Sequence, residues 1–484
     1  MAFSADSVLK RHLTLRSVFI WAFLISLFAL AVRQITNLDP DFWWHLKSGQ
    51  YILQTRAIPH ADPFSFSRAG SAWVAHEWLS EIIMYATFRL AGWAGLLVLF
   101  AATITTSLAI VYQRSEGRPF VAAFAVFLAA LASAPLFGLR PQMFTFLFAS
   151  ILFALLDRYR QEGRRRLLWA VPPMMLLWVN LHAGFALGPA LIVLFVIMAA
   201  LERNWQRIKP LIATLIICIV VIPINPSGFR MFSYPFETLS SPAMQTLIQE
   251  WLSPDFHQFR FLPLAFLMLA TFTAVILSPV RIRPGELFGL LVLSLAALRS
   301  GRNIPIYALY AAPILAEHSW DWINARDFKL KISSKPVTGV GIALNLLLVL
   351  LPTLVSVRRI VDFSRHEKTY EAQSLPAAAV DFVSEQHLPP PIFNDYNWGG
   401  YLIWRLYPDH KVFVDGRADL YGDAFIFDYL KTYKGDRDWQ ARLDNYGIST
   451  VLIEPDSALA TLLRQQKEWR VAYEDKQAVV FTRK

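Results

Sequence analysis

The first residues suited to chemistry lie in the stretch LDPDFWWHLKSGQYIL at 38–53, directly after an apolar run. Asp39-Pro40 is typical of a helix start, because Asp is a favoured N-cap and Pro is favoured in the first turn. Asp41 and His45 are then four residues apart and share one helical face. A carboxylate and an imidazole on one face could transfer a proton, so this stretch is a candidate for acid–base catalysis as well as for capping.

Two further acid–histidine pairs follow, His60 with Asp62 and His76 with Glu77. Three such groups in one segment could serve proton transfer or bind a divalent cation such as Mg or Mn. Carboxylates are the ligands that these cations prefer, so the candidate metal ligands are Asp39, Asp41 and Glu250, the last in a later polar segment. The ligand spacing of a structural zinc site is not evident.

The elements that must position these residues are membrane helices. Of 484 residues, 55% are hydrophobic and only 17% are charged. The apolar residues gather in blocks of about 17–22, long enough to cross a hydrocarbon core of about 30 Å as helices. We expect a polytopic α-helical membrane protein with about eleven spans, near 17–35, 93–113, 119–137, 142–157, 167–181, 184–201, 210–224, 261–278, 285–299, 303–316 and 337–355.

The positive charge is concentrated in alternate loops. The formal net charge of +10 could suggest nucleic acid, but most loop arginines and lysines lie in short segments at 114–118, 158–166, 202–209, 279–284 and 317–336. Cytoplasmic loops carry this excess. We therefore expect membrane lipid and no nucleic acid as a partner, a cytoplasmic N-terminus and an extracytoplasmic C-terminus. The protein is expected in a bacterial inner membrane.

Two loops and the tail remain outside. The first loop, 36–92, ends in LSEIIMYATFRLA, whose apolar spacing predicts a helix lying at the interface. The second is 225–260. The tail, 364–484, alternates predicted strands with helical stretches, which indicates a small α/β domain after a membrane domain at 1–363. The expected strands are 412–415, 450–454 and 478–483, and the expected helices are 376–387 and 456–468.

Asp39-Pro40-Asp41-Phe42 matches the Asp-Pro-x-Phe opening of the first outside loop in oligosaccharyltransferase catalytic subunits. With its inside N-terminus, many spans and C-terminal α/β domain, the chain resembles the GT-C superfamily of membrane glycosyltransferases. Protein O-mannosyltransferases and lipid A aminoarabinose transferases have comparable acids at this place. The tail holds no counterpart of the WWDYG-type signature, which argues against protein N-glycosylation.

The resemblance implies transfer of a sugar from a polyprenyl-phosphate donor to a glycan, lipid or protein acceptor at the outer face, by one inverting displacement. Asp39, and after it Asp41, would deprotonate or orient the acceptor hydroxyl. Five further acids and histidines of the first loop would contact the acceptor or support these acids: His45, His60, Asp62, His76 and Glu77.

Cations must neutralise the departing lipid phosphate. Arg299 and Arg302, in RSGRN, and Arg140, in GLRPQ, are expected at the same outer face as Asp39. Arginine favours bidentate contact with phosphate oxygens. The alternative is that arginines at a helix end extend to water without a ligand. His182, at another outside turn, is expected to be a structural hydrogen-bonder.

Two other functions remain open. One is a glycan ligase or polymerase acting on lipid-linked chains, although its large loop would be expected late in the chain. The other is a GT-C-like transporter or binding protein without catalysis, for which ionisable residues near the bilayer centre would be expected. No G-x-S-x-G, phosphate-binding loop, dinucleotide fingerprint or paired CxxC occurs, which argues against hydrolase, ATPase and redox roles.

Overall fold

The structure, a computed structural model, describes residues 15–115, 118–326 and 340–484. The expected basic segment at 317–336 lies outside the described residues from 327 onwards. The same is true of residues 116–117 in the segment 114–118 and of residues 337–339 in the last expected span.

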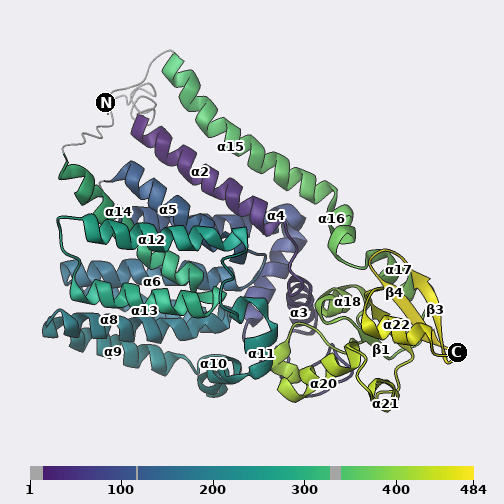
Figure 1. Ribbon diagram of the computed structural model, residues 1–484. Coiled ribbons are helices and arrows are strands. Elements are labelled where there is room, and N and C mark those ends of the chain that lie inside the picture. The colour runs from purple at the N-terminus through teal and green to yellow at the C-terminus, as the bar shows by residue number, and fades with distance from the viewer. Residues whose placement is uncertain (1–14, 116–117, 327–339) are drawn as a thin grey trace.

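Long apolar helices form a bundle on one side of the molecule (Figure 1). A helix lies at each of the predicted positions. These are α2 (Leu15–Ile35), α4 (Trp78–Arg114), α5 (Pro119–Ser133), α6 (Gln142–Glu162), α7 (Val171–Leu181), α8 (Leu187–Leu201), α9 (Trp205–Val221), α12 (Leu262–Leu277), α13 (Pro284–Arg299), α14 (Ile304–Asn324) and α15 (Val340–Arg365). Within the described part of the chain, six helices are long and apolar enough to cross a membrane. The chain is an integral membrane protein, and the count of about eleven spans stays a prediction.

Helix α4 contains the predicted interfacial helix and the predicted second span. Gly92 separates them with φ 57° and ψ −152°, backbone angles that only glycine adopts readily. Leu90, just before this kink, leaves 88% of its surface exposed. The exposed leucine and the kink agree with a helix that lies along the interface before the chain turns into the membrane.

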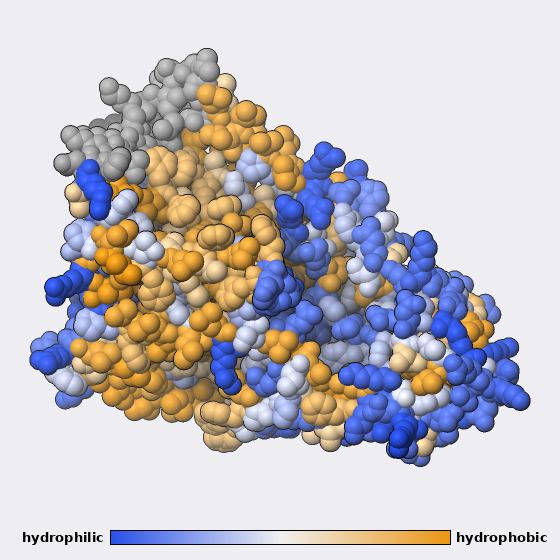
Figure 2. Space-filling model, viewed as in Figure 1, coloured by the Kyte–Doolittle hydropathy of each residue, from blue (hydrophilic) through white to orange (hydrophobic). Residues whose placement is uncertain are grey.

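The surface of the molecule has an apolar part and a hydrophilic part, which correspond to the apolar helices and the polar tail of the sequence. Figure 2 shows apolar side chains over the helical bundle and hydrophilic side chains over the part that holds the C-terminal strands. Exposed apolar residues on the bundle include Phe124, Ile216, Phe266 and Leu295. Such a continuous apolar surface is the one that lipid would cover.

Short helices lie in the connections between the long helices. They are α3 (Phe42–Thr55), α10 (Arg230–Ser240), α11 (Pro242–Leu247) and the short helices η1 (Ala134–Leu136), η2 (Arg165–Ala170), η3 (Ala183–Ala186), η4 (Gln249–Trp251), η5 (Phe259–Phe261) and η6 (Gly301–Asn303). Helix α3 packs against both α4 and α18 (Gly399–Leu406). Its buried aromatic residues, Phe42 and Trp43, anchor it there.

The C-terminal region is a small mixed sheet with helices. Its strands are β1 (Ile392–Asn394), β2 (Thr450–Ile453), β3 (Trp469–Glu474) and β4 (Val479–Arg483), in the order β1-β2-β4-β3. Strands β1 and β2 are parallel, and β4 is antiparallel to both neighbours. The remaining elements are α16 (Glu367–Ser374), α17 (Ala377–Glu385), η7 (Tyr396–Trp398), α19 (Ala418–Tyr421), α20 (Asp423–Tyr433), α21 (Trp439–Asn445) and α22 (Ala458–Arg464).

The sheet matches two of the three expected strands. The expected strand at 412–415 is wrong, because Val412 makes only an isolated bridge, to Ser65 in the first loop. The backbone after it is held by a side chain instead. Asn394 accepts from the Phe413 N–H at 2.8 Å and donates to the Val414 carbonyl at 2.8 Å. This segment therefore joins the first loop to the sheet without entering it.

Candidate active site

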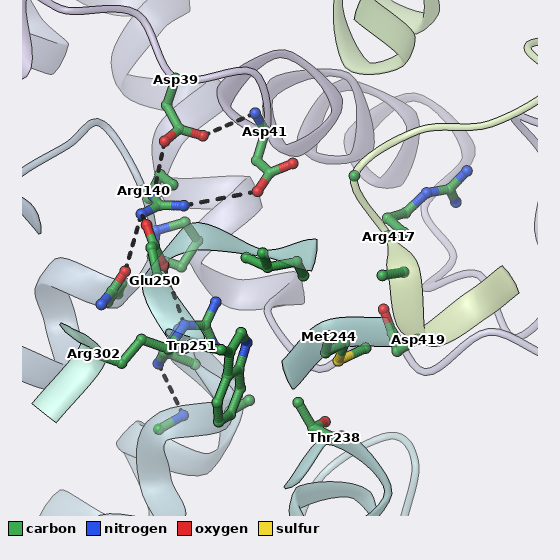
Figure 3. Close-up of a pocket in the computed structure, with 18 of the residues that line it drawn as sticks. Asp39, Asp41, Arg140, Thr238, Met244, Glu250, Trp251, Arg302, Arg417 and Asp419 are labelled. Carbon is green, nitrogen blue, oxygen red and sulfur yellow. Dashed lines mark hydrogen bonds and ion pairs between the residues drawn. The ribbon is translucent and has the colours of Figure 1, made fainter. Parts of the chain in front are cut away.

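Asp39 and Asp41 lie where the first loop turns into α3. Asp39 Oδ1 accepts a hydrogen bond from the Asp41 N–H at 2.9 Å, and the helix expected here begins at Phe42, with Asp41 and not Asp39 at the N-cap position. Asp41 Oδ1 accepts from Trp44 Nε1 at 3.2 Å. The second oxygen of each carboxylate, Oδ2, faces Arg140 (Figure 3).

Arg140 lies among three carboxylates. Its Nε is 3.3 Å from Asp39 Oδ2, and its Nη1 is 3.8 Å from Asp41 Oδ2. Its Nη2 donates to Glu250 Oε1. Arg140 precedes α6 and Glu250 belongs to η4, so this cluster joins three separate parts of the chain. The guanidinium fork can address several acceptors because its five N–H groups are fixed in one plane.

Arg302 extends the cluster on the far side of Glu250. Its Nε donates to Glu250 Oε2 at 3.1 Å, and its guanidinium lies 4.6 Å from the centre of the Trp251 ring. The two oxygens of Glu250 therefore contact two different arginines. Arg302 leaves 35% of its side chain exposed, compared with 12% for Arg140.

The charges of this cluster are unequal, since three carboxylates meet two guanidiniums. Burial raises the pKa of Asp39, and burial together with the Asp39 charge raises the pKa of Asp41 to about 7. Burial would also raise the pKa of Glu250, but Arg140 and Arg302 outweigh it and lower that pKa to about 2. Both Asp39 and Asp41 therefore have a pKa above the usual range of a carboxyl, and that of Asp41 lies near neutral pH.

A second cluster surrounds Glu77. Its Oε1 lies 3.3 Å from His76 Nε2 and 3.3 Å from His182 Nε2, and its Oε2 lies 3.3 Å from His45 Nδ1. Burial opposes a charge on His76, but Glu77 beside it raises the pKa of His76 to about 9. Burial lowers the pKa of His45 to about 3 and that of His182 to about 4. One imidazolium thus pairs with Glu77, while the other two rings are neutral.

His182 is a member of this cluster that the sequence placed only as a structural hydrogen-bonder. Its Nδ1 accepts from the Gly184 N–H at 2.9 Å and contacts the Thr145 hydroxyl at 2.7 Å. Because Nδ1 accepts, the neutral ring carries its proton on Nε2, which faces Glu77. These contacts fit the structural role, and they also fix the ring beside Glu77.

Tyr234 was not predicted at the site. Its hydroxyl donates to Asp419 Oδ2 at 3.1 Å and lies 3.4 Å from His76 Nε2. It joins α10 to the first loop and to the C-terminal region. The aromatic and acidic run VFVDGRADLYG, which contains Asp419, was the only sequence signal for this contact.

Both clusters line one cavity of about 1000 Å³. Its opposite wall comes from the C-terminal region and includes Asp395, Tyr396, Asn397, Asp419 and Glu454. Figure 3 shows Asp419 beside Met244 and Thr238, across the cavity from Asp41. The cavity thus receives side chains from the membrane helices, both outside loops and the C-terminal region.

Three of the expected site residues lie outside this cavity. His60 and Arg299 are exposed and do not line it. Asp62 is buried, and its Oδ1 accepts from Arg417 Nη1 at 2.7 Å. Arg417 also pairs with Asp415 at 2.7 Å. Asp62 therefore joins the first loop to the C-terminal region. The structure brings the other expected residues to the cavity: Asp39, Asp41, His45, His76, Glu77, Arg140, Glu250 and Arg302.

The carboxylates proposed for a metal do not fit one as they are arranged. Asp39, Asp41 and Glu250 converge on the Arg140 guanidinium, which lies where their common ligand would be. In residues 15–115, 118–326 and 340–484, no group of three or more His, Cys, Asp or Glu side chains is placed to hold a metal ion. We therefore assign no step to a metal.

Comparisons with known proteins identify the fold. No family model matches the chain, and no curated protein matches it. ArnT from Cupriavidus metallidurans, solved bound to undecaprenyl phosphate, is similar over 99% of this chain and 98% of its own, with 17% identity and a TM-score of 0.51. The archaeal oligosaccharyltransferase AglB from Archaeoglobus fulgidus, solved with an inhibitory peptide and a dolichol-phosphate, is similar over 90% and 69%, with 10% identity and a TM-score of 0.53.

A further structure of the Archaeoglobus enzyme, in complex with Zn and sulfate, has a TM-score of 0.50 at 12% identity over 90% and 68% of the two chains. This chain therefore shares its fold with ArnT and AglB, which is the fold that the Asp-Pro-x-Phe resemblance predicted. At these identities the likeness concerns the fold.

Proposed function

We propose that the protein is a membrane glycosyltransferase that moves a sugar from a polyprenyl-phosphate donor to an acceptor hydroxyl. The observation that carries this proposal is the cluster of Asp39, Asp41 and Arg140 beside Arg302 in one cavity. Proton-accepting carboxylates next to phosphate-binding guanidiniums are what an inverting displacement needs. The GT-C fold and the lipid phosphates bound by its neighbours support this assignment.

Arg302 and Arg140 bind the donor phosphate in this proposal. Arg302 is the more exposed of the two, and a planar guanidinium contacts two phosphate oxygens at once. The same cavity has an apolar wall that includes Met143, Phe146, Leu187, Leu247 and Ile306, which suits a prenyl chain. One end of the cavity thus binds the charged headgroup and the neighbouring wall binds hydrocarbon.

Asp41 is the general base. The acceptor oxygen attacks the anomeric carbon, the bond from that carbon to the phosphate oxygen breaks, and the acceptor proton passes to Asp41. The bonding electrons leave with the lipid phosphate, whose charge the arginines neutralise. The sequence favours Asp39 for this role, but Arg140 lies closer to Asp39, at 3.3 Å, than to Asp41, at 3.8 Å, and the pKa of Asp41 is raised to about 7. Asp39 therefore positions Arg140 and Asp41.

The reaction faces the outer side of the membrane in this proposal. Helices α6 and α8 begin at Gln142 and Leu187, which line the cavity, and the basic segments 158–166 and 202–209 lie at their other ends, on the expected cytoplasmic side. Alkaline phosphatase fused after Lys484 should be active, and the same enzyme fused at Arg164 should be inactive. The reverse pattern would place the cavity in the cytoplasm.

The direct test of the activity uses the purified protein and radiolabelled polyprenyl-phosphate sugars with a membrane extract as the source of acceptor. We expect label to move from the lipid fraction to an acceptor with the wild type and not with Asp41→Asn. Equal transfer by both proteins, or transfer by neither from any of the lipid-linked sugars, would contradict the proposal.

A further inference from the structure

Glu250 holds the two arginines in the way that a phosphate would. One carboxylate oxygen contacts Arg140 Nη2 and the other contacts Arg302 Nε at 3.1 Å. A phosphate bound between the same side chains would likewise give one oxygen to each guanidinium. Glu250 is ionised at any physiological pH, because the two arginines lower its pKa to about 2. The phosphate-binding arginines are thus already bridged by an anion from the chain itself.

We propose that Glu250 occupies the phosphate position of the donor site and must leave it when a phosphoryl group binds. This inference rests on the proposed function and adds a competitor to its donor site. When Asp39 and Asp41 are both ionised, they and Glu250 carry one negative charge more than the two arginines balance, so a phosphate added beside all three carboxylates would be repelled. Exchange of Glu250 for phosphate keeps one anion between Arg140 and Arg302.

The exchange needs only the side chain to move. The Glu250 carbonyl accepts from the Ser300 hydroxyl at 3.1 Å, and the Leu252 carbonyl accepts from the Gly301 N–H at 3.0 Å. These two bonds fix the backbone of η4 against the turn that carries Arg302. The Glu250 carboxylate can therefore rotate into the open cavity while Trp251 stays stacked on Arg302.

Three substitutions separate this role from others. Glu250→Gln keeps the shape and removes the charge. Glu250→Asp keeps the charge, but the shorter side chain cannot reach both guanidiniums from the fixed backbone. Glu237→Gln makes the same charge change on an exposed residue of α10, in the same outside segment and away from the cavity. It serves as the matched control.

The measurement is binding of undecaprenyl phosphate, inorganic phosphate and undecaprenol to each detergent-solubilised variant, by thermophoresis after a thermal melt confirms folding. If Glu250 fills the site in nine-tenths of the molecules or more, it weakens phosphate binding by about tenfold or more. We expect Glu250→Gln to bind undecaprenyl phosphate about tenfold more tightly than the wild type. Glu250→Asp should lie between them, and Glu237→Gln should not differ. Undecaprenol, which lacks the phosphate, should bind all of them equally.

Each other outcome decides against the inference. Equal or weaker phosphate binding by folded Glu250→Gln would make Glu250 an anchor of the arginines and leave the proposed function untouched. If that variant does not fold, unchanged binding by Glu250→Asp would likewise make Glu250 an anchor. Tightening for inorganic phosphate alone would assign the arginines to a soluble phosphate. Absence of undecaprenyl phosphate binding in every variant, wild type included, would remove the proposed donor site as well.

Discussion

The Nε atom of Arg140 lies 3.3 Å from Oδ2 of Asp39, although the two residues are about 100 positions apart in sequence. The contact joins the acid of the Asp-Pro-x-Phe stretch to an arginine in the loop before α6. Arg140 reaches Asp41 and Glu250 from the same place. One guanidinium therefore sets the positions of the carboxylates on which the proposed chemistry depends.

Replacement of Arg140 should affect both stability and activity. Arg140→Ala leaves three carboxylates with only Arg302 to oppose them, and removal of one partner of a largely buried charge pair costs about 3–5 kcal/mol. Arg140→Lys keeps the charge but not the fork, so it should restore folding more than activity. Thermal melts and transfer assays on both variants test this. A stable, fully active Arg140→Ala protein would contradict the central role of this residue.

Arg302 and Arg299 offer a matched pair, since they lie three residues apart and only Arg302 lines the cavity. Loss of a charge-assisted bond to phosphate costs about 1.5–3 kcal/mol, so Arg302→Ala should weaken binding of undecaprenyl phosphate by at least tenfold. Arg299→Ala should bind it as the wild type does. Similar losses in both variants would show that the outer positive charge, and not this site, binds the lipid.

The pH dependence of transfer should report Asp41. A general base acts in its ionised form, and burial together with Asp39 raises the pKa of Asp41 to about 7. We expect kcat/KM to rise with pH up to about 7 and then to level off. The limb below pH 7 should be missing from the residual activity of Asp41→Asn. A profile that is flat from pH 5 to 8 would exclude a base with this pKa.

Asp62 should matter for stability and not for chemistry. It shares the buried Arg417 with Asp415, at 2.7 Å from each, and Arg417 also lies 4.7 Å from the centre of the Trp73 ring. Breaking such a buried pair costs about 3–5 kcal/mol, so Asp62→Ala and Arg417→Ala should melt at clearly lower temperatures.

The exposed pair of Arg464 and Glu474 provides the comparison, because such pairs contribute about 0–1 kcal/mol. Arg464→Ala should melt close to the wild type. At temperatures where Asp62→Ala remains folded, its kcat should be near that of the wild type. A large loss of kcat without a loss of stability would instead support the role first predicted for Asp62, contact with the acceptor.

Much of the fold could be predicted because the length of an apolar block is a local signal, whereas the orientation inferred from the basic loops stays a prediction. The kink at Gly92 separates the two helices where the apolar spacing predicted a change, and β2 and β4 lie where β-branched runs predicted strands. The segment 412–415 has the same composition, but Asn394 satisfies its backbone with a side chain. That competition cannot be seen in the segment itself.

For the candidate site, the structure reports where the residues lie, and their roles stay predictions. Asp39, Asp41, Arg140 and Arg302 were expected at one face of the membrane, and the structure brings them to one cavity. Arg299 ends α13 and Arg302 lies in the short helix η6 that follows, so the two arginines are neighbours in sequence. Only Arg302 lines the cavity, while Arg299 is exposed. The partners of Asp62 and Tyr234 lie in the C-terminal region, 355 and 185 positions away, so no local pattern could have identified them.

The most direct test of the proposed mechanism compares Asp39→Asn and Asp41→Asn in sugar transfer from a lipid-linked donor, with folding confirmed by thermal melt. Asn preserves the size of each side chain but cannot accept the acceptor proton, and general base catalysis contributes about 10²–10⁴ in rate. We predict a loss of this size for Asp41→Asn, with binding of undecaprenyl phosphate retained. Asp39→Asn should lose less, because its amide still accepts from the Asp41 N–H. Full activity of the folded Asp41→Asn protein would contradict the proposed mechanism.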